Sequence, residues 1–340
     1  MRTKPLTYKQ AGVDIAGAEK FVKKIKKFTR ATITPKSKSE IGGFGAIFDF
    51  SGLKVKEPLL ISSTDGVGTK LKIAFLTNRH DTVGIDLVAM NVNDILTTGA
   101  TPLFFLDYIS TSKIKVKVLT DIIKGISRGC RDAGCSLIGG ELAEMPGFYK
   151  RGEYDLAGFC TGVVEKKKML AGENVSQGDV VIGLASSGLH SNGFSLVREV
   201  FSPKEQRNLA GELLKPTSIY VKPVISLLKK VNSRSQKAIK AMAHVTGGAF
   251  YQKVSKILPQ GRAINIYKDT WPVPGIFRLI EKKGHIKEKE MFGTFNMGIG
   301  FVLIAAAKDA SKIIRYLAIQ KVKSWVIGEV VKGKREIRIS

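Results

Sequence analysis

The stretch Pro58-Leu-Leu-Ile-Ser-Ser-Thr-Asp-Gly-Val-Gly-Thr-Lys70 decides the fold class of this chain. Its first six residues predict a short buried strand, Asp65 to Lys70 predict a glycine-containing loop, and Leu71 to Leu76 predict a helix. The same order of strand, loop and helix recurs between Asp179 and Phe201. Because strands and helices alternate, the sequence predicts an α/β or α+β protein.

The chain length and the remaining periodic segments indicate two domains. At roughly 150 residues per domain, 340 residues suffice for two, and the basic run Lys166-Lys167-Lys168 is a plausible boundary. We therefore expect a flexible basic N-terminal arm (residues 1–40), a first domain with a mixed sheet (41–168) and a C-terminal α/β domain (169–340). Further strands are predicted at Pro102–Ile109, Ser136–Glu141, Tyr154–Val164 and Gly298–Ala306, and helices at Ala18–Arg30, Ile85–Thr98, Val116–Ala133 and near 250–257.

Composition excludes several classes of protein. The uncharged stretch Thr294 to Ala307 is too short to span a bilayer. No apolar run follows the basic start of the chain, so no signal peptide is predicted. Three cysteines are too few for a disulfide framework. We expect a cytoplasmic protein with reduced thiols and no membrane partner.

The net charge of +26 is unevenly distributed. Residues 57–165 hold eleven basic and thirteen acidic residues, whereas residues 1–30 hold nine basic and two acidic ones. The C-terminal lysines alternate with apolar residues at helical spacing, which is typical of a solvated helix face. A nucleic-acid partner would instead favour a basic stripe with aromatic residues, so we expect no such partner and look for function in the slightly acidic segment.

Three acidic residues near the ends of predicted elements are candidate metal ligands. Asp65 begins the loop that ends in Lys70, where glycines let backbone N–H groups approach phosphates and the lysine can neutralise their charge. The spacing is not that of a Walker A motif, and a plain structural turn is the alternative. Asp94 and Glu141 are the second and third acids, although Asp94 could also lie on a polar helix face. Together they match an Mg²⁺–triphosphate site better than any one of them alone.

Three further loops carry candidate binding residues. Gly42-Gly43-Phe44-Gly45 could fold over a nucleotide or be an ordinary flexible loop. Ser186 to Gly193 lies between a strand and a helix and offers donors to a phosphate. His244-Val245-Thr246-Gly247-Gly248 also precedes a predicted helix. His190 and His244 could act there as donors or as acid and base, or could be capping or buried histidines.

The ordered set of these motifs resembles the phosphoribosylformylglycinamidine cyclo-ligases, the aminoimidazole ribonucleotide synthetases of purine biosynthesis. The resemblance runs through essentially the whole chain, and it departs from the usual family pattern where Leu189, Phe194 and Ala249 stand in place of Pro, Tyr and Gly. Ala249 matters most, because its methyl group could crowd a backbone approach. The motifs that carry the resemblance are Tyr8–Ile15, Gly42–Gly45, Asp65–Lys70, Gly84–Asp94, Gly139–Gly147, the two histidine loops and Thr294–Gly300.

The resemblance implies a fold and a reaction. The first domain would bind ATP and Mg²⁺, and its strands would join those of a second subunit in a barrel-like homodimer core. ATP would phosphorylate the formamide oxygen of formylglycinamidine ribonucleotide, after which a ring nitrogen attacks and phosphate leaves. The enzyme then mainly supplies positioning and charge neutralisation. The alternative is an ATP-dependent phosphotransferase similar to thiamine-monophosphate kinase, a relative of the same architecture.

The resemblance also implies roles for individual residues. Mg²⁺ would be held by Asp65, Asp94 and Glu141. The nucleotide would be bound by Gly42, Gly43, Phe44, Gly45, Asp65, Gly66, Val67, Gly68, Thr69 and Lys70. Substrate or its phosphate would be bound by Ser191, Asn192, Gly193, Thr246, Gly247 and Gly248. Catalytic roles would fall to His190, His244 and Lys27.

Overall fold

The computed structural model describes residues 12, 14–38, 41, 45–232 and 237–340. Among the described residues, the strands form one sheet of four and one of six, which divide the chain between β4 and β5. We call them the N-terminal sheet and the C-terminal sheet. The elements of the first part are α1 (Ile15–Arg30), β1 (Pro58–Gly66), α2 (Lys70–Thr77), α3 (Val83–Leu96), β2 (Thr101–Thr111), α4 (Val116–Ala133), β3 (Ser136–Glu144) and β4 (Tyr154–Glu165).

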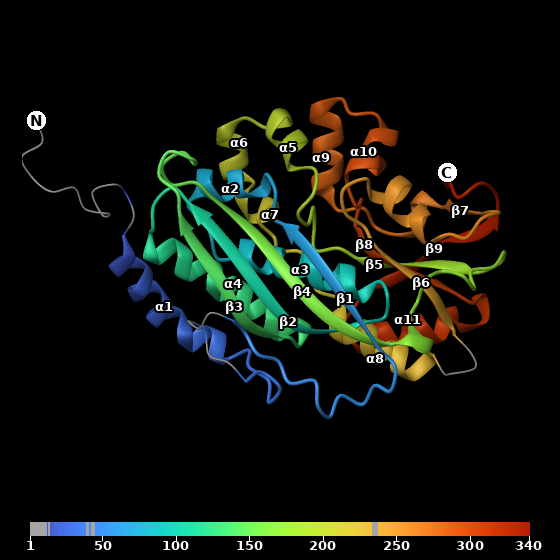
Figure 1. The fold of residues 1–340 in the computed structure, drawn as a ribbon. Coiled ribbons are helices and arrows are strands. Elements are labelled where there is room, and N and C mark those ends of the chain that lie inside the picture. Colours follow the sequence, from blue (N-terminus) through green and yellow to red (C-terminus); the bar gives the residue numbers. More distant parts are fainter. Residues whose placement is uncertain (1–11, 13, 39–40, 42–44, 233–236) are drawn as a thin grey trace, which may run out of the picture.

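The N-terminal sheet is mixed and open, with strand order β1-β4-β2-β3. β4 runs antiparallel to both β1 and β2, and β2 runs parallel to β3. Helices α3 and α4 cover one face, and α1 packs outside α4 (Figure 1). The other face is not covered by a described helix, and it exposes Leu60 by 57% and Phe159 by 44%. A half-covered sheet with exposed apolar side chains marks a surface that a partner could bury.

Helix α1 forms because its apolar residues recur at helical spacing. Asp14 caps its first turn by accepting from Gly17 N at 3.2 Å, and the last turn is basic, as the helix dipole favours. Phe21 and Ile25 are buried. Residues 15–30 of the expected basic arm are therefore a packed helix.

The C-terminal sheet has strand order β10-β7-β9-β5-β8-β6. Its inner strand β8, next to the edge strand β6, is buried along its whole length, as a strand covered on both faces must be. In Figure 1, α9 and α10 lie above this sheet and α8 and α11 below it. The elements of this part are β5 (Val180–Ala185), α5 (Phe194–Val200), α6 (Pro203–Asn208), α7 (Ala210–Leu213), α8 (Val221–Val231), β6 (Ile239–His244), β7 (Arg262–Ile266), α9 (Gly275–Gly284), α10 (Glu288–Thr294), β8 (Ile299–Ala305), α11 (Ala310–Ile319), β9 (Ser324–Lys332) and β10 (Ile337–Ile339).

The α/β class and most of the predicted elements are confirmed. The helix expected near 250–257 is present as a π-helix at Ala249–Lys253 followed by a 3₁₀-helix at Val254–Ile257. The N-terminal sheet is not closed into a barrel within this chain. Across the described part of the chain, no helix is both long enough and apolar enough to cross a membrane. The division at residues 40 and 168 stays a prediction.

Candidate active site between the two sheets

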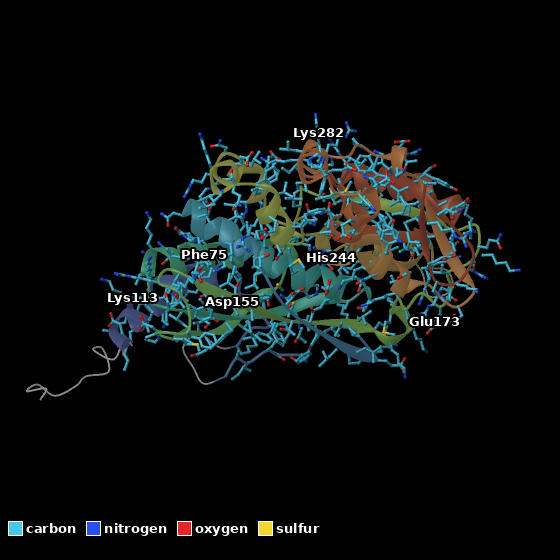
Figure 2. All side chains as sticks on the ribbon, turned by 90° about the horizontal axis from the view of Figure 1, so that it is seen from above. Phe75, Lys113, Asp155, Glu173, His244 and Lys282 are labelled. Carbon is cyan, nitrogen blue, oxygen red and sulfur yellow. The ribbon has the colours of Figure 1, made fainter. Side chains whose placement is uncertain are left out.

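Helix α3 connects the two sheets, because it packs on β1 and β4 and also contacts β6 and α8. Its C-terminal half carries Asn93 and Asp94 toward the end of β6. Figure 2 shows His244, the last residue of β6, deep between the two parts of the molecule. The candidate site is therefore built from both halves of the chain.

Asp94 and His244 form the centre of this site. Their Oδ1 and Nδ1 atoms are 2.8 Å apart, and the Asn93 amide nitrogen lies 3.4 Å from His244 Nε2. Because an amide N–H can only donate, Nε2 accepts and Nδ1 carries the proton given to Asp94. The Asp94 side chain is 37% exposed, so the histidine holds a carboxylate that remains accessible.

Asp65 lies near the end of β1 and shares the electrostatic environment of this pair. Burial raises the pKa of the Asp65 carboxyl, as does the charge of Asp94, whereas the Gly66 N–H, His244 and Lys253 lower it. Gly66 N donates to Asp65 Oδ1 at 2.8 Å. Two carboxylates and a histidine, from β1, α3 and β6, therefore lie within electrostatic reach of one another.

A cavity of about 210 Å³ opens beside Asp94 and His244. Lys253 and Lys256 lie in its wall, although the sequence analysis passed over both. Ammonium groups next to carboxylates suit a ligand that carries phosphate and a cation together. The remaining lining residues are Thr97, Met242, Ala243 and Ile257.

The loop from Ser186 to Gly193 connects β5 to α5 and contains three buried polar atoms without a hydrogen-bond partner among the described residues, one of which is His190 Nδ1. Ser191 Oγ and Asn192 Nδ2 are buried and have no hydrogen-bond partner among the described residues. We call these two groups the loop donors. Buried polar groups are almost always paired, so unpaired ones at a loop of this kind indicate a ligand. Asn192 Oδ1 also lies beside Gly247, which places the second predicted loop against the first.

His190 occupies a different position from the one its predicted catalytic role requires. Its side chain is 1% exposed, and Nε2 accepts from Ser187 N at 3.2 Å and Ser218 N at 3.4 Å. Burial, followed by the charges of His244 and Lys70, holds the pKa of His190 well below its ordinary value. The imidazole is thus a neutral bracket inside the loop, and the geometry does not support proton transfer by His190.

Lys70 also departs from its expected role as a phosphate partner. Its ammonium group is fully buried and bonds to Asp86 and to the carbonyl oxygens of His190 and Lys215. Such a group does not face a ligand, so the expected contact with phosphate is not supported. Asp86 and Thr217, which complete this cluster, were missed by the sequence analysis.

Glu141 and Lys27 lie at the opposite edge of the N-terminal sheet from Asp65. The register Asp65–Gly158–Asp107–Gly140 separates Asp65 from β3 by three strand spacings, or roughly 14 Å. Lys27 is an exposed residue of α1, which packs on α4 and β3. Within the described ranges, no three His, Cys, Asp or Glu side chains lie close enough to hold a metal. The predicted magnesium set is therefore not brought together by one chain.

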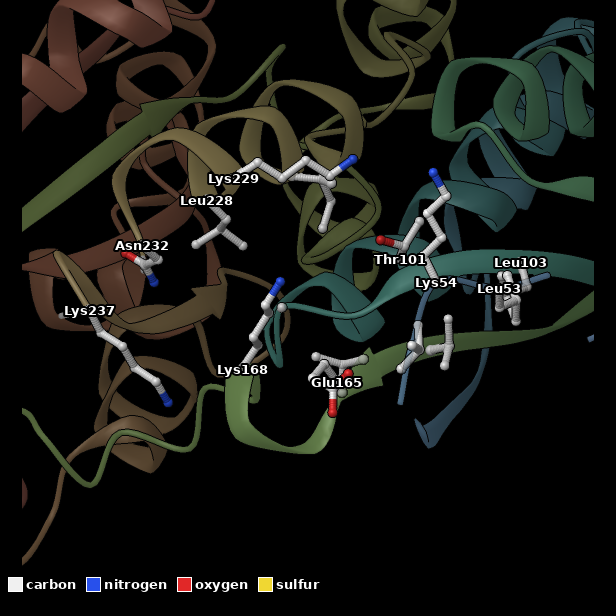
Figure 3. Close-up of a pocket in the computed structure, with 15 residues that line it drawn as sticks. Leu53, Lys54, Thr101, Leu103, Glu165, Lys168, Leu228, Lys229, Asn232 and Lys237 are labelled. Atoms are coloured by element: carbon white, nitrogen blue, oxygen red, sulfur yellow. The ribbon is translucent and has the colours of Figure 1, made fainter. Parts of the chain in front are cut away.

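The remaining predicted residues and a second cavity lie outside this site. Gly42, Gly43 and Phe44 fall outside the described residues, and Gly45 is exposed. A cavity of about 450 Å³ lies between α8 and the far end of the N-terminal sheet, with Lys54, Lys168 and Lys229 around it (Figure 3). None of the predicted site residues lines that cavity.

Comparison with known proteins gives one consistent assignment. Two family models match, "AIR synthase related protein, N-terminal domain" over residues 49–164 and "AIR synthase related protein, C-terminal domain" over residues 176–339. A phosphoribosylformylglycinamidine cyclo-ligase of Caldicellulosiruptor bescii is 52% identical over 96% of this chain and 98% of its own length. The enzyme of the same name from Alkaliphilus metalliredigens is 48% identical over 98% and 97%.

Solved structures show the same fold at much lower identity. Hydrogenase maturation protein HypE in complex with ATP has a TM-score of 0.69 at 15% identity, covering 96% of this chain and 92% of its own. A thiamine-monophosphate kinase from Stenotrophomonas maltophilia has a TM-score of 0.67 at 16% identity, covering 94% and 95%. At this identity the likeness establishes the architecture alone.

Proposed function

The chain belongs to the phosphoribosylformylglycinamidine cyclo-ligase family, and from that premise we propose that it converts formylglycinamidine ribonucleotide and ATP to 5-aminoimidazole ribonucleotide, ADP and phosphate. The family match spans nearly the whole chain on both sides. The single structural observation that supports the proposal is the meeting of Asp65, Asp94 and His244 beside the loop donors. An ATP-dependent ring closure needs both a site for the cation that neutralises the triphosphate and a loop that binds the substrate phosphate.

The carboxylates of Asp65 and Asp94 fit a magnesium ion. They share one partly exposed site, where their charges repel and a cation would relieve the repulsion. Bound Mg²⁺ would supply neutralisation of the triphosphate charge. Asp94 is kept in place by the Nδ1–H of His244, so His244 contributes by holding this carboxylate.

The loop donors fit the phosphate of the ribonucleotide. Ser191 Oγ and Asn192 Nδ2 lie just before the N-terminus of α5, whose dipole also favours an anion. Gly193 must be glycine here, because its φ is +79° and a Cβ would collide with the Phe295 ring. Thr246, Gly247 and Gly248 would approach the substrate from the neighbouring loop. In this arrangement the substrate is fixed at its phosphate while its reacting end faces Asp94.

A homodimer would complete the metal site. The open face of the N-terminal sheet exposes Leu60 and Phe159. The candidate metal ligands Asp65 and Glu141 lie on the opposite edge strands of this sheet, β1 and β3. If two such sheets close into a barrel-like core, β1 of one copy lies beside β3 of the other. Asp65 and Asp94 would then meet Glu141 and Lys27 of the second copy.

Mixed dimers test this arrangement. Asp65→Asn and Glu141→Gln chains with different tags are produced separately and together, and the doubly tagged dimer is isolated. Each homodimer should be inactive, whereas the mixed dimer keeps one complete site and about half the wild-type activity per dimer. An inactive mixed dimer would place both residues in a site made by one chain.

The reaction itself is tested by substrate-dependent ADP release. Purified protein with ATP and Mg²⁺ should release ADP only when formylglycinamidine ribonucleotide is added, and one aminoimidazole ribonucleotide should form for each ADP. Release with thiamine monophosphate alone would favour the phosphotransferase alternative. The same proposal includes a cytoplasmic enzyme with small-molecule partners and no bound nucleic acid.

A further inference from the structure

Lys70 and Asp86 form an ion pair at the junction of the two halves of the molecule. Lys70 Nζ lies 2.9 Å from both carboxylate oxygens, and neither side chain has any exposed surface. Lys70 begins α2, and Asp86 lies in the first turn of α3. Both charges belong to the N-terminal part.

The remaining bonds of this pair all go to the C-terminal part. Lys70 Nζ also donates to His190 O at 2.9 Å and to Lys215 O at 2.7 Å. Asp86 Oδ1 accepts from Thr217 N at 2.8 Å and Thr217 Oγ1 at 2.7 Å. One ion pair therefore fixes two separate segments, the loop around His190 and the segment from Lys215 to Thr217.

Stability alone does not account for such a pair. Removing two charges from water is expensive, and apolar residues of the same volume often serve a fold equally well. What a buried ion pair adds is direction, because each of its donors and acceptors must meet a partner in a defined place. Here the three N–H groups of Lys70 are divided among Asp86, His190 and Lys215.

The segment that Lys70 holds leads directly into the loop donors. His190 precedes Ser191 and Asn192 and has a φ of +60°, a left-handed conformation that is strained for a non-glycine residue. Its carbonyl is held by Lys70, and its Nε2 accepts from Ser218 N, next to Thr217. The strained turn is thus clamped from both sides by groups that depend on the pair.

Helix α3 carries a second contact of the same kind. Asn93 lies seven residues after Asp86 on the same helix face, accepts from Tyr220 N at 3.0 Å and donates to Ser218 O at 2.8 Å. The next residue is Asp94 of the candidate site. One rigid helix therefore connects Asp94 to the segment that supports the loop donors.

We propose that Lys70 and Asp86 are positioning residues, which set the loop donors at a fixed distance from Asp65 and Asp94 across the junction of the two halves. This inference rests on the proposed function for what the loop donors bind. The positioning itself concerns contacts of this chain alone. The two parts can therefore be tested separately.

The decisive variants separate charge burial from positioning. Lys70→Met leaves Asp86 buried and unpaired, so the melting temperature should fall by about 10 °C or more. Lys70→Met/Asp86→Asn removes both charges and should regain at least half of that loss. Yet His190 O and Lys215 O still lack their donor in the double variant. Its KM for formylglycinamidine ribonucleotide should stay raised about tenfold or more, while its KM for ATP changes less than about twofold.

Amide hydrogen exchange gives a readout that needs no turnover. In the double variant, peptides covering 186–193 and 215–219 should exchange at least about tenfold faster than in the wild type. Lys72→Met is the matched control, because Lys72 lies on the same helix in a partly exposed ion pair with Glu153. It should leave the melting temperature, both KM values and the exchange rates near those of the wild type.

Two outcomes would overturn the inference. The first is a double variant with recovered stability, wild-type KM and wild-type exchange, which would make the pair a purely structural element. If neither Lys70 variant folds, Thr217→Val is the substitute, because it removes one bond to Asp86. It should raise hydrogen exchange at 215–219 and the ribonucleotide KM severalfold. The second overturning outcome is a Thr217→Val protein in which neither quantity changes. A wild-type protein without ribonucleotide-dependent ADP release would refute the proposed function, and the exchange result would still decide the positioning.

Discussion

The two strand–loop–helix turns of this protein, Asp65–Lys70 and Ser186–Gly193, look alike in sequence but differ in whether their polar side chains are paired inside the protein. The first turn uses its lysine internally, as the centre of a buried cluster. The second turn leaves three buried polar atoms, His190 Nδ1 and the two loop donors, without a partner within the described residues. A lysine beside a glycine loop is therefore weaker evidence for a phosphate site than unpaired donors are, because the lysine can form a buried ion pair within the protein instead.

The comparison also divides the chemistry between the turns. The first turn offers its carboxylate, Asp65, whose pKa responds to the charges of Asp94 and His244. The second turn offers neutral donors at the start of a helix. A ligand with a cation at one end and a phosphate at the other would use both.

The largest effect should come from removing the carboxylate of the first turn. Asp65→Asn keeps the shape and the bond from Gly66 N but loses the charge. We expect kcat to fall on the order of a hundredfold or more, with a melting temperature close to wild type. Turnover is measured as ADP release and folding by circular dichroism; near-normal turnover would remove Asp65 from the active site and collapse the comparison.

Matched glycine substitutions compare the backbone of the two turns. Gly68 and Gly193 have φ angles of +70° and +79°, but a Cβ at Gly68 meets nothing within 4 Å, whereas one at Gly193 collides with Phe295. Gly68→Ala should cost about 1 kcal/mol in the free energy of unfolding, and Gly193→Ala about 3 kcal/mol. Denaturant unfolding measures both. Equal costs would show that the second turn can relax away from α5 and is less rigid than its contacts indicate.

Asn192→Ala tests whether the loop donors are kept for a ligand. Since Asn192 Nδ2 has no partner among the described residues, removing it breaks no internal bond at that atom. The free energy of unfolding should therefore change by less than about 1 kcal/mol or rise, while the ribonucleotide KM increases about tenfold. Ser191→Ala should act in the same direction with a smaller effect. A loss of stability with an unchanged KM would assign these groups to the fold.

Local patterns in the sequence predicted the elements around the site well. The helix expected at Val116–Ala133 has those same ends, because its apolar face and the glycine at its C-cap are local signals. The position flagged at Ala249 is strained in the structure, with a φ of +32°. This position was singled out because the family pattern has glycine there, and not from local periodicity.

Long-range pairing was not readable from the sequence. Lys70 meets Asp86 across 16 residues, but it meets His190 and Lys215 across 120 and 145. No local sequence pattern distinguishes a lysine that is buried in such a cluster from a lysine that faces a phosphate. Asn93 could have been singled out, since it lies beside Asp94 and seven residues after Asp86 on one helix face. The separation of Asp65 from Glu141 follows from strand order, which periodicity does not determine.

The smallest expected effect is the pH dependence of stability that arises from the buried His190 in the second turn. The pKa of His190 is held well below 6.5, chiefly by burial, so the folded protein keeps this imidazole neutral where the unfolded chain protonates it. A lowered pKa contributes stability that is fully present above pH 6.5 and is lost as pH falls below it.

Between pH 7 and 5.5 we expect the wild type to lose about 1 kcal/mol more than His190→Gln, whose amide oxygen can still accept from Ser187 N and Ser218 N. His80, whose pKa is also lowered by burial, is present in both proteins and cancels from the difference. His285→Gln, at an exposed histidine, is the matched control for the substitution itself. If His190→Gln shows the same dependence as the wild type, His190 takes up a proton without cost, and the second turn opens more readily than a clamped loop should.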